Sequence, residues 1–141
     1  QHPDIHYNLH NLYGYSEQNV TVKALESIRK KRALTVSRST YAGSGVFGAH
    51  WLGDNHAEWY DLRMAIPGIL AMNIFGITLV GPDICGLLGD TTVELCTRWQ
   101  QVGAFYPFSR NHNTKNDIPQ DPTAFGQPAE HITRAALLTR Y

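Results

Sequence analysis

The stretch Ile77-Thr78-Leu79-Val80-Gly81-Pro82-Asp83-Ile84 decides the fold class, because a short apolar run leads directly into a polar turn. A run of this kind indicates a strand that is buried on both faces, as strands of a parallel sheet are. We therefore expect a buried parallel strand over 77–80, with Asp83 just beyond its carboxyl end. Pro82 removes a backbone donor immediately before Asp83, so we expect a modest change in that strand end.

Helical and strand patterns alternate on both sides of this stretch. Strands are expected over 33–37, 49–52, 77–80 and 105–109. Helices are expected over 16–32 and 59–75, then from the Thr-x-x-Glu capping box at Thr91 to Glu94, and finally from Pro128. Strands that alternate with helices predict an α/β fold with a parallel sheet and right-handed crossovers, either a barrel or a doubly wound sheet.

Composition narrows the class of protein. The 141 residues are 43% hydrophobic and 17% charged, which is typical of a globular protein with one core. Twelve basic and twelve acidic residues give a formal net charge of zero, so no electrostatic footprint for nucleic acid or an anionic membrane surface is present. The most apolar stretch, 66–80, is too short and too interrupted by proline and glycine to span a bilayer, and no signal peptide is visible.

No cofactor or metal is expected. The seven histidines form neither an HExxH frame nor a paired spacing with cysteine. His6 and His10 could share a helical face, although surface and packing roles suit them better. None of the glycine patterns follows a strand in the way that a phosphate-binding loop requires.

A carboxylic acid lies just beyond the second expected strand, in His50-Trp51-Leu52-Gly53-Asp54-Asn55. Beside the apolar wall of Trp51 an ionised carboxyl group loses solvation, so the pKa of Asp54 should rise. Asp54 is therefore a candidate general acid. The alternative is that Asp54 only caps the helix that begins near Trp59, because turns favour Gly, Asp and Asn on backbone grounds.

Polar clusters follow all four expected strands, and barrel enzymes build their sites from the loops at the carboxyl ends of strands. The clusters begin at Ser37, Trp51, Gly81 and Ser109. Their Arg, Asp, Asp and His residues provide hydrogen-bond partners for sugar hydroxyls, and the neighbouring aromatic residues can pack against sugar rings. A neutral carbohydrate fits this set of side chains.

These motifs resemble family 31 of the glycoside hydrolases, in the branch of lysosomal acid α-glucosidase, maltase-glucoamylase and sucrase-isomaltase. The resemblance runs almost end to end and rests on five motifs: His10 to Gly14, Ser37 to Thr40, His50 to Asn55, Asp83 to Gly86 and Gly103 to Asn113. It implies that residues 1–141 are the carboxyl-terminal half of a catalytic (β/α)8 TIM barrel, roughly strands five to eight with their helices and no second domain. The loop 41–48 would replace the fifth helix.

The resemblance also implies roles for individual residues. Asp54 falls on the acid/base catalyst of a retaining enzyme, and the residues that fall on or near the subsite for the terminal glucose are Arg38, Trp51, Asp83, His112, Arg110 and Phe108. A retaining mechanism needs a second carboxylate about 5 Å from the acid. The family's nucleophile lies in a Trp-x-Asp-Met-Asn-Glu segment that this sequence does not contain. We therefore expect a fragment that is inactive alone and that pairs with the remainder of its own catalytic domain.

Two cysteines and one sequon bear on the cellular compartment. Cys85 and Cys96 leave free thiols and a disulfide equally open by composition, but the resemblance implies a disulfide and so an oxidising compartment. The intact protein is expected in the secretory pathway, as a lysosomal, extracellular or membrane-tethered form. Asn19-Val20-Thr21 is a glycosylation sequon near an expected helix start, where exposure is plausible.

Two functions remain open at this point. In the first, the intact protein is a retaining α-glucosidase that hydrolyses terminal non-reducing α-1,4-linked glucose from maltose-like oligosaccharides. In the second, it is a non-catalytic carbohydrate-binding or structural derivative that has lost the nucleophile half. The presence of every expected site residue in this part of the barrel favours the enzyme. An α-xylosidase on the same barrel would share much of this frame.

Overall fold

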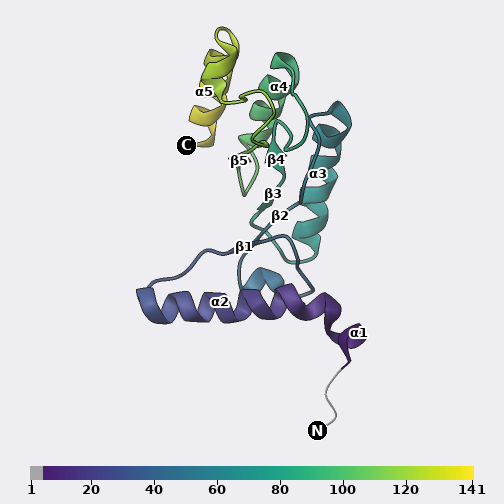
Figure 1. Cartoon of the computed structure of the whole chain (residues 1–141). Coiled ribbons are helices and arrows are strands. Elements are labelled where there is room, and N and C mark those ends of the chain that lie inside the picture. The colour runs from purple at the N-terminus through teal and green to yellow at the C-terminus, as the bar shows by residue number, and fades with distance from the viewer. Residues whose placement is uncertain (1–4) are drawn as a thin grey trace.

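The computed structural model describes residues 5–141 and consists of parallel strands that alternate with helices (Figure 1). The helices and strands are α1 (His6–Leu9), α2 (Tyr13–Arg29), β1 (Val36–Ser37), β2 (Ala49–Trp51), α3 (Trp59–Ile74), β3 (Val80–Gly81), β4 (Asp83–Ile84), α4 (Val93–Gly103), β5 (Arg110–Asn111) and α5 (Ala129–Arg140). Three 3-10 helices are η1 (His10–Leu12), η2 (Ser44–Val46) and η3 (Pro122–Phe125). This order confirms the predicted α/β alternation, with η2 in the loop between β1 and β2.

The segment 80–84 joins the two small sheets of the structure. One sheet has the order β1-β2-β3 and the other pairs β4 with β5, and all pairs are parallel. Pro82 lies between β3 and β4 and has no N–H to donate, so the ladder changes partner there. Trp51 is paired with Gly81 and Asp83 with Arg110. The carboxyl ends of β1, β2 and β3 therefore lie together, and those of β4 and β5 lie side by side.

Gly81 allows the chain after α4 to approach β3 closely. A Cβ at this position would lie 1.9 Å from the carbonyl oxygen of Phe108. The Phe108 N–H donates to the carbonyl of Val80 at 3.1 Å, which continues the contact between the central segment and the last strand. A side chain at position 81 would separate these two segments.

Two predicted strands differ from the structure. The strand expected over 105–109 is wrong, because Phe105 and Tyr106 donate back to Val102 and Gly103 in turns that end α4. The observed strand is β5, which begins at Arg110. The strand expected over 77–80 begins only at Val80, since the Ile77 N–H still donates to Met72 at the end of α3. Asp83 consequently lies within a strand and not in the loop beyond it.

Helix ends also shift by a few residues. α2 stops at Arg29, because Lys30 takes a left-handed conformation with φ 53°. The cap of α4 is Thr92 and not Thr91, and the Thr92 hydroxyl accepts a hydrogen bond from the Leu95 N–H at 3.2 Å. Pro128 precedes α5 as its N-cap residue. α3 continues through Pro67.

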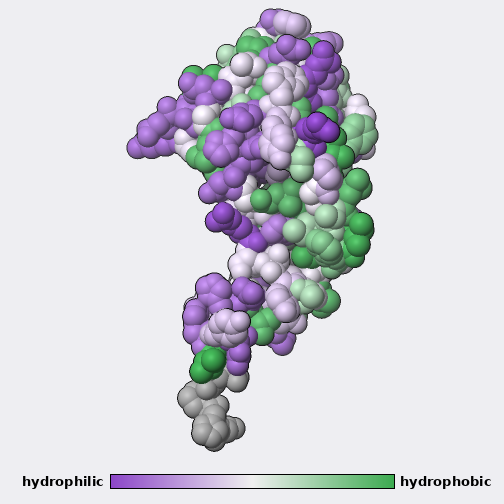
Figure 2. Space-filling view, turned by 90° about the vertical axis from the view of Figure 1, so that its right-hand side faces the viewer, coloured by the Kyte–Doolittle hydropathy of each residue, from purple (hydrophilic) through white to green (hydrophobic). Residues whose placement is uncertain are grey.

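The main core lies where α3 and α4 pack against the strand ends, and its centre is Trp99, which is 0% exposed. The outer side of α3 remains apolar and open: Ile66, Leu70 and Ile74 are 49%, 60% and 83% exposed. Figure 2 shows apolar side chains gathered over the middle of the face on which α3 lies. None of the helices in residues 5–141 is long and apolar enough to cross a membrane.

A disulfide joins Cys85 to Cys96, as the resemblance implied. It links the turn that follows β4 to the first half of α4. Cys85 and Gly86 both have positive φ, at 78° and 90°, so the chain reverses sharply at this point. The disulfide therefore fixes a tight turn directly beyond Asp83.

The sequon residue Asn19 does not have the exposure that the sequence analysis expected. It lies well inside α2, which begins at Tyr13, and not near a helix start. Its side chain is half-buried, and Oδ1 is buried without a hydrogen-bond partner in the described part of the chain.

The disulfide should contribute measurably to stability. Cys85 and Cys96 are separated by 11 positions in the sequence. Replacement of both by serine removes this cross-link, so the unfolded chain gains conformational entropy and the free energy of unfolding falls by about 3 kcal/mol. We expect a lower thermal midpoint for the double variant of the whole protein, and a similar drop when the wild-type protein is reduced. An unchanged midpoint in both experiments would contradict a structural role for this bond.

Candidate functional site

The candidate site lies along the edge where the strands end. Arg38 directly follows β1, Asp54 lies three residues beyond β2, Asp83 lies two residues beyond β3, and His112 directly follows β5. Because all the strands are parallel, their following loops lie on the same side of the sheet. The structure thus gathers residues that are as much as 74 positions apart in the sequence, from Arg38 to His112.

Asp83 and Arg110 form a buried ion pair at the centre of this edge. Asp83 is 0% exposed, and its Oδ1 accepts hydrogen bonds from the Arg110 Nε at 2.8 Å and from Nη2. The strand register produces this contact, because it places the two residues opposite each other. Burial raises the pKa of Asp83 above its usual range, while the hydrogen bond and charge of Arg110 oppose the rise.

The second carboxylate oxygen of Asp83 is in a different situation. Oδ2 is buried and has no hydrogen-bond partner among residues 5–141. A buried acceptor without a partner costs free energy, since water has been removed and nothing replaces it. This oxygen can accept a hydrogen bond from a donor outside the described residues.

Two aromatic rings surround the guanidinium group of Arg110. Its Cζ lies 5.6 Å from the ring centre of Trp51 and 5.7 Å from that of Phe108, distances at which a cation is attracted to an aromatic face. Trp51, Asp83, Phe108 and Arg110 therefore form one contacting group. All four are among the residues that the sequence analysis selected.

Asp54 is exposed, which corrects the expectation that Trp51 would bury it. The buried carboxylate of the site is Asp83 instead. Asp54 does not cap α3 either, because the residue at that position is Glu58, whose side chain makes no capping hydrogen bond. The electrostatic influence of Asp54 on the pKa of Asp83 is one of the causes that raise it.

Gly53 brings the Asp54 loop close to Arg38. Its φ is 89°, and a Cβ built there would lie 3.2 Å from the Arg38 Nε. Arg38 is exposed and, together with Trp51, lines a hollow of about 460 Å³ beside α2. Arg38 thus lies next to the loop that carries Asp54.

Asn55 is a site residue that the sequence analysis missed. Its Nδ2 donates to the backbone carbonyl of Asp83 at 2.8 Å, and its Oδ1 accepts from the Leu87 N–H at 3.1 Å. The backbone carbonyl of Asn55 accepts from both Leu87 and Leu88 at 3.0 Å. The loop after Asp54 is therefore tied to Asp83 and to the disulfide turn. An asparagine after Gly-Asp is ordinary in a turn, so no sequence signal marked it.

His112 is exposed, and its charge lowers the pKa of Asp83, as the charge of a neighbouring cation should. Gln120 is a second residue that was missed, and its carboxamide nitrogen donates to the backbone carbonyl of His112 at 3.0 Å.

Within residues 5–141, no group of three or more His, Cys, Asp or Glu side chains could hold a metal ion. His6 and His10 do share a face, with Nε2 and Nδ1 2.8 Å apart.

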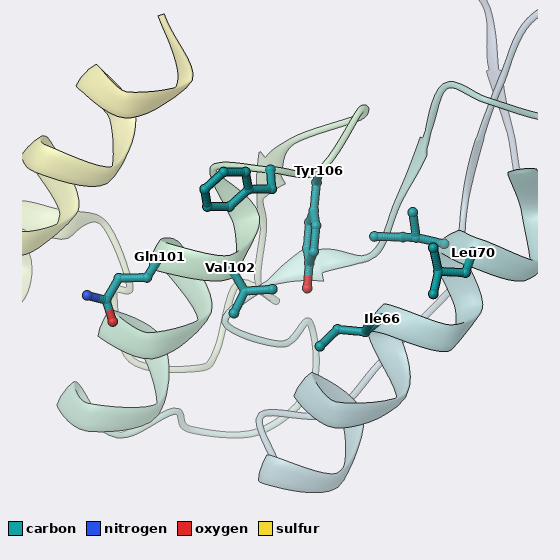
Figure 3. A pocket seen from close by; sticks show the side chains of 7 residues that line it. Ile66, Leu70, Gln101, Val102 and Tyr106 are labelled. Carbon is teal, nitrogen blue, oxygen red and sulfur yellow. The ribbon is translucent and has the colours of Figure 1, made fainter.

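A strongly apolar hollow lies away from these residues. A groove of about 540 Å³ runs between α3 and α4, where Ile66 and Leu70 face Val102 and Tyr106 (Figure 3). The side chains that line it include no carboxylate, histidine, lysine or arginine. We assign no chemistry to this groove, because reaction at a sugar requires the titratable groups at the strand ends.

Comparisons with known proteins show the family and agree with the fold. Residues 1–141 match the family model "Glycosyl hydrolases family 31 TIM-barrel domain". Lysosomal alpha-glucosidase of Mus musculus is 49% identical over 136 residues, 96% of this chain and 14% of the mouse protein. Probable maltase-glucoamylase 2 of Homo sapiens is 56% identical over 126 residues, 89% of this chain and 5% of that protein. The crystal structure of the glucosidase II alpha subunit superposes with a TM-score of 0.91 at 40% identity, over 96% of this chain and 15% of that one.

Replacement of Arg110 should destabilise the protein, because the buried carboxylate of Asp83 loses its charged partner. In Arg110→Met, Asp83 keeps its burial but loses its partner, so the whole protein should lose on the order of 3 kcal/mol of stability near neutral pH. The folded state holds the proton of Asp83 more tightly than the unfolded chain does, so ionisation of Asp83 costs stability as pH rises through its raised pKa. The deficit of the variant should therefore shrink as pH falls. Thermal denaturation at neutral and mildly acidic pH measures this change.

Arg98→Met provides the control. Arg98 is an exposed residue of α4 and takes part in neither ion pair found in residues 5–141. We expect a small effect that does not change with pH. An Arg110→Met deficit that is equally small, or that grows on acidification, would contradict the role given to the pair.

Proposed function

The chain belongs to glycoside hydrolase family 31, and from that membership we propose that the whole protein is a retaining α-glucosidase. We propose that it hydrolyses terminal non-reducing α-1,4-linked glucose from maltose-like oligosaccharides. The chain spans 14% of the mouse relative, so most of such an enzyme would lie outside these residues. The names of the relatives, lysosomal alpha-glucosidase and maltase-glucoamylase, favour a glucoside substrate.

The observation that carries the proposal is the buried Oδ2 of Asp83, which has no partner among residues 5–141. A sugar hydroxyl can donate to this oxygen and recover the free energy that its burial costs. Oδ1 is already held by Arg110, so the carboxylate cannot turn away. The site is therefore prepared for one donor in a fixed direction, as recognition of a particular hydroxyl requires.

The neighbouring side chains supply the other contacts of a glucose subsite. The ring of Trp51 is amphipathic and can pack against the apolar face of a sugar. Arg38 and His112 offer donors from the ends of β1 and β5, and Phe108 adds a second aromatic ring beside Arg110. In this assignment Asp83, Arg110, Arg38 and His112 orient glucose, and none of them transfers the reacting proton.

We assign the proton transfers to Asp54. Its exposed carboxyl group would protonate the glycosidic oxygen as the bond to the leaving group breaks. In the second half of the reaction the same group would remove a proton from the attacking water. The nucleophile would be a carboxylate about 5 to 5.5 Å away, which we propose comes from the remainder of the catalytic domain.

The open sheet edges support pairing with the remainder of the catalytic domain. β1 pairs only with β2 and β5 only with β4 in the described chain, so each presents one open edge. A closed barrel removes such edges by pairing them with further strands. We propose that residues 1–141 form the carboxyl-terminal half of the barrel, that the other half pairs at β1 and β5, and that this half alone is inactive. The disulfide fits a protein of the secretory pathway.

Removal of the acid should be decisive in the whole protein. Asp54→Asn keeps the size of the side chain but cannot supply the proton, so kcat/KM for maltose should fall by at least about 10²-fold. Binding of glucose should change little, because its hydroxyls are assigned to other side chains. Steady-state hydrolysis of maltose and titration with glucose measure the two effects.

Glu58→Gln is the matched control, since Glu58 is an exposed acid of the same loop whose side chain makes no capping hydrogen bond. We expect nearly wild-type hydrolysis. Undiminished turnover in Asp54→Asn would remove Asp54 from the mechanism. A wild-type protein that binds glucose but hydrolyses no α-glucoside would support the non-catalytic alternative.

A further inference from the structure

Gln120 lies between β5 and η3 and is 3% exposed. Its Nε2 lies within hydrogen-bond distance of four oxygens: the carbonyls of Ile84 at 3.3 Å, Gly86 at 3.1 Å and His112 at 3.0 Å, and the Asn111 Oδ1 at 2.9 Å. In return, the Asn111 Nδ2 donates to the carbonyl of Gln120 at 2.8 Å. One side chain thus connects the ends of β4 and β5 and the disulfide turn.

The chemistry of this cage allows only a donor at its centre. A carboxamide nitrogen has two hydrogens, which four acceptor oxygens must share. These oxygens fix which end of the amide faces inward, because an oxygen there would meet only other acceptors. A side chain without an N–H would leave buried carbonyls without their donor.

The position of the cage matters because it lies at the last pair of the β4–β5 ladder. The last paired residues are Ile84 and Asn111, each one residue beyond the ion pair of Asp83 and Arg110. His112 is the next residue after that ladder. Gln120 binds the carbonyls of both Ile84 and His112 at the end of the ladder, so it helps to set the spacing of the two chains beyond the last pair.

We propose that Gln120 is a positioning residue of the glucose subsite, which holds the His112 segment in register with Asp83 through the Ile84, Gly86 and His112 carbonyls. The inference rests on the proposed function, because it assigns Gln120 to the same subsite. Gln120 itself touches neither the acid nor the reacting bond. It acts through the backbone of residues that would contact the sugar.

The competing explanation is that Gln120 only stabilises the fold, and Gln100 provides the control for it. Gln100 is also buried, at 8% exposure, but among residues 5–141 its Nε2 reaches only the Cys85 Sγ, at 3.9 Å. Methionine has a length similar to that of glutamine and carries no N–H. Gln120→Met and Gln100→Met therefore remove buried carboxamides of the same size, and only the first should disturb His112.

The test is direct titration of the folded whole protein with glucose, followed by maltose kinetics. We expect Gln120→Met to weaken glucose binding and to lower kcat/KM for maltose by roughly tenfold each, since displacement by a fraction of an ångström is enough. Gln100→Met should leave both within about twofold even if its thermal midpoint falls. Asn111→Ala, at an exposed residue of β5, should weaken glucose binding by roughly threefold and replaces Gln120→Met if that variant does not fold.

Glucose affinity in Gln120→Met equal to that in Gln100→Met would overturn the inference, as would unchanged affinity in Asn111→Ala when Gln120→Met does not fold. These results leave the proposed function in place, because the wild-type protein still binds glucose and cleaves maltose. A wild-type protein that binds no glucose would instead contradict the proposed function, and this inference with it.

Discussion

The buried carboxylate of Asp83 is the constraint on which the rest of the site depends. A carboxylate with no exposed surface is tolerated only with a partner, and the β4–β5 register supplies Arg110 directly opposite. Arg110 in turn contacts the rings of Trp51, from the end of β2, and of Phe108. One charge pair therefore fixes the relative positions of three strand ends. The oxygen that Arg110 does not reach remains for a ligand.

The turn 85–88 connects the buried ion pair to the surrounding loops. The disulfide attaches it to α4, while Asn55 connects it to the loop of Asp54 and Gln120 connects it to the segment of His112. Gly86 lets the chains meet there, because a Cβ would lie 2.4 Å from the Ala57 backbone nitrogen. The proposed acid and the proposed sugar-binding groups are thus held to one rigid turn. Loops with few regular hydrogen bonds can then keep a defined geometry.

Sequence patterns predicted the order of helices and strands and the gathering of polar residues at strand ends, since both follow from local periodicity and from parallel pairing. They failed where contacts between residues far apart in the sequence determine the strand position or the burial of a side chain. Strands of two residues, such as β5, are too short to show an alternating pattern, so the aromatic run 105–109 was mistaken for the strand. The burial of Asp83 rather than Asp54 depends on neighbours far away in the sequence. Asn55 and Gln120 are common turn and loop residues whose partners only the fold reveals.

The most direct measurement is a crystal structure of the whole protein with glucose bound. We expect one glucose at the strand ends, with a hydroxyl donating to Asp83 Oδ2, the ring against Trp51, and the carboxyl group of Asp54 beside the oxygen on the anomeric carbon. Glucose bound elsewhere, or an Asp83 Oδ2 that a protein side chain occupies and no sugar reaches, would contradict the assignment of this edge as the glucose subsite.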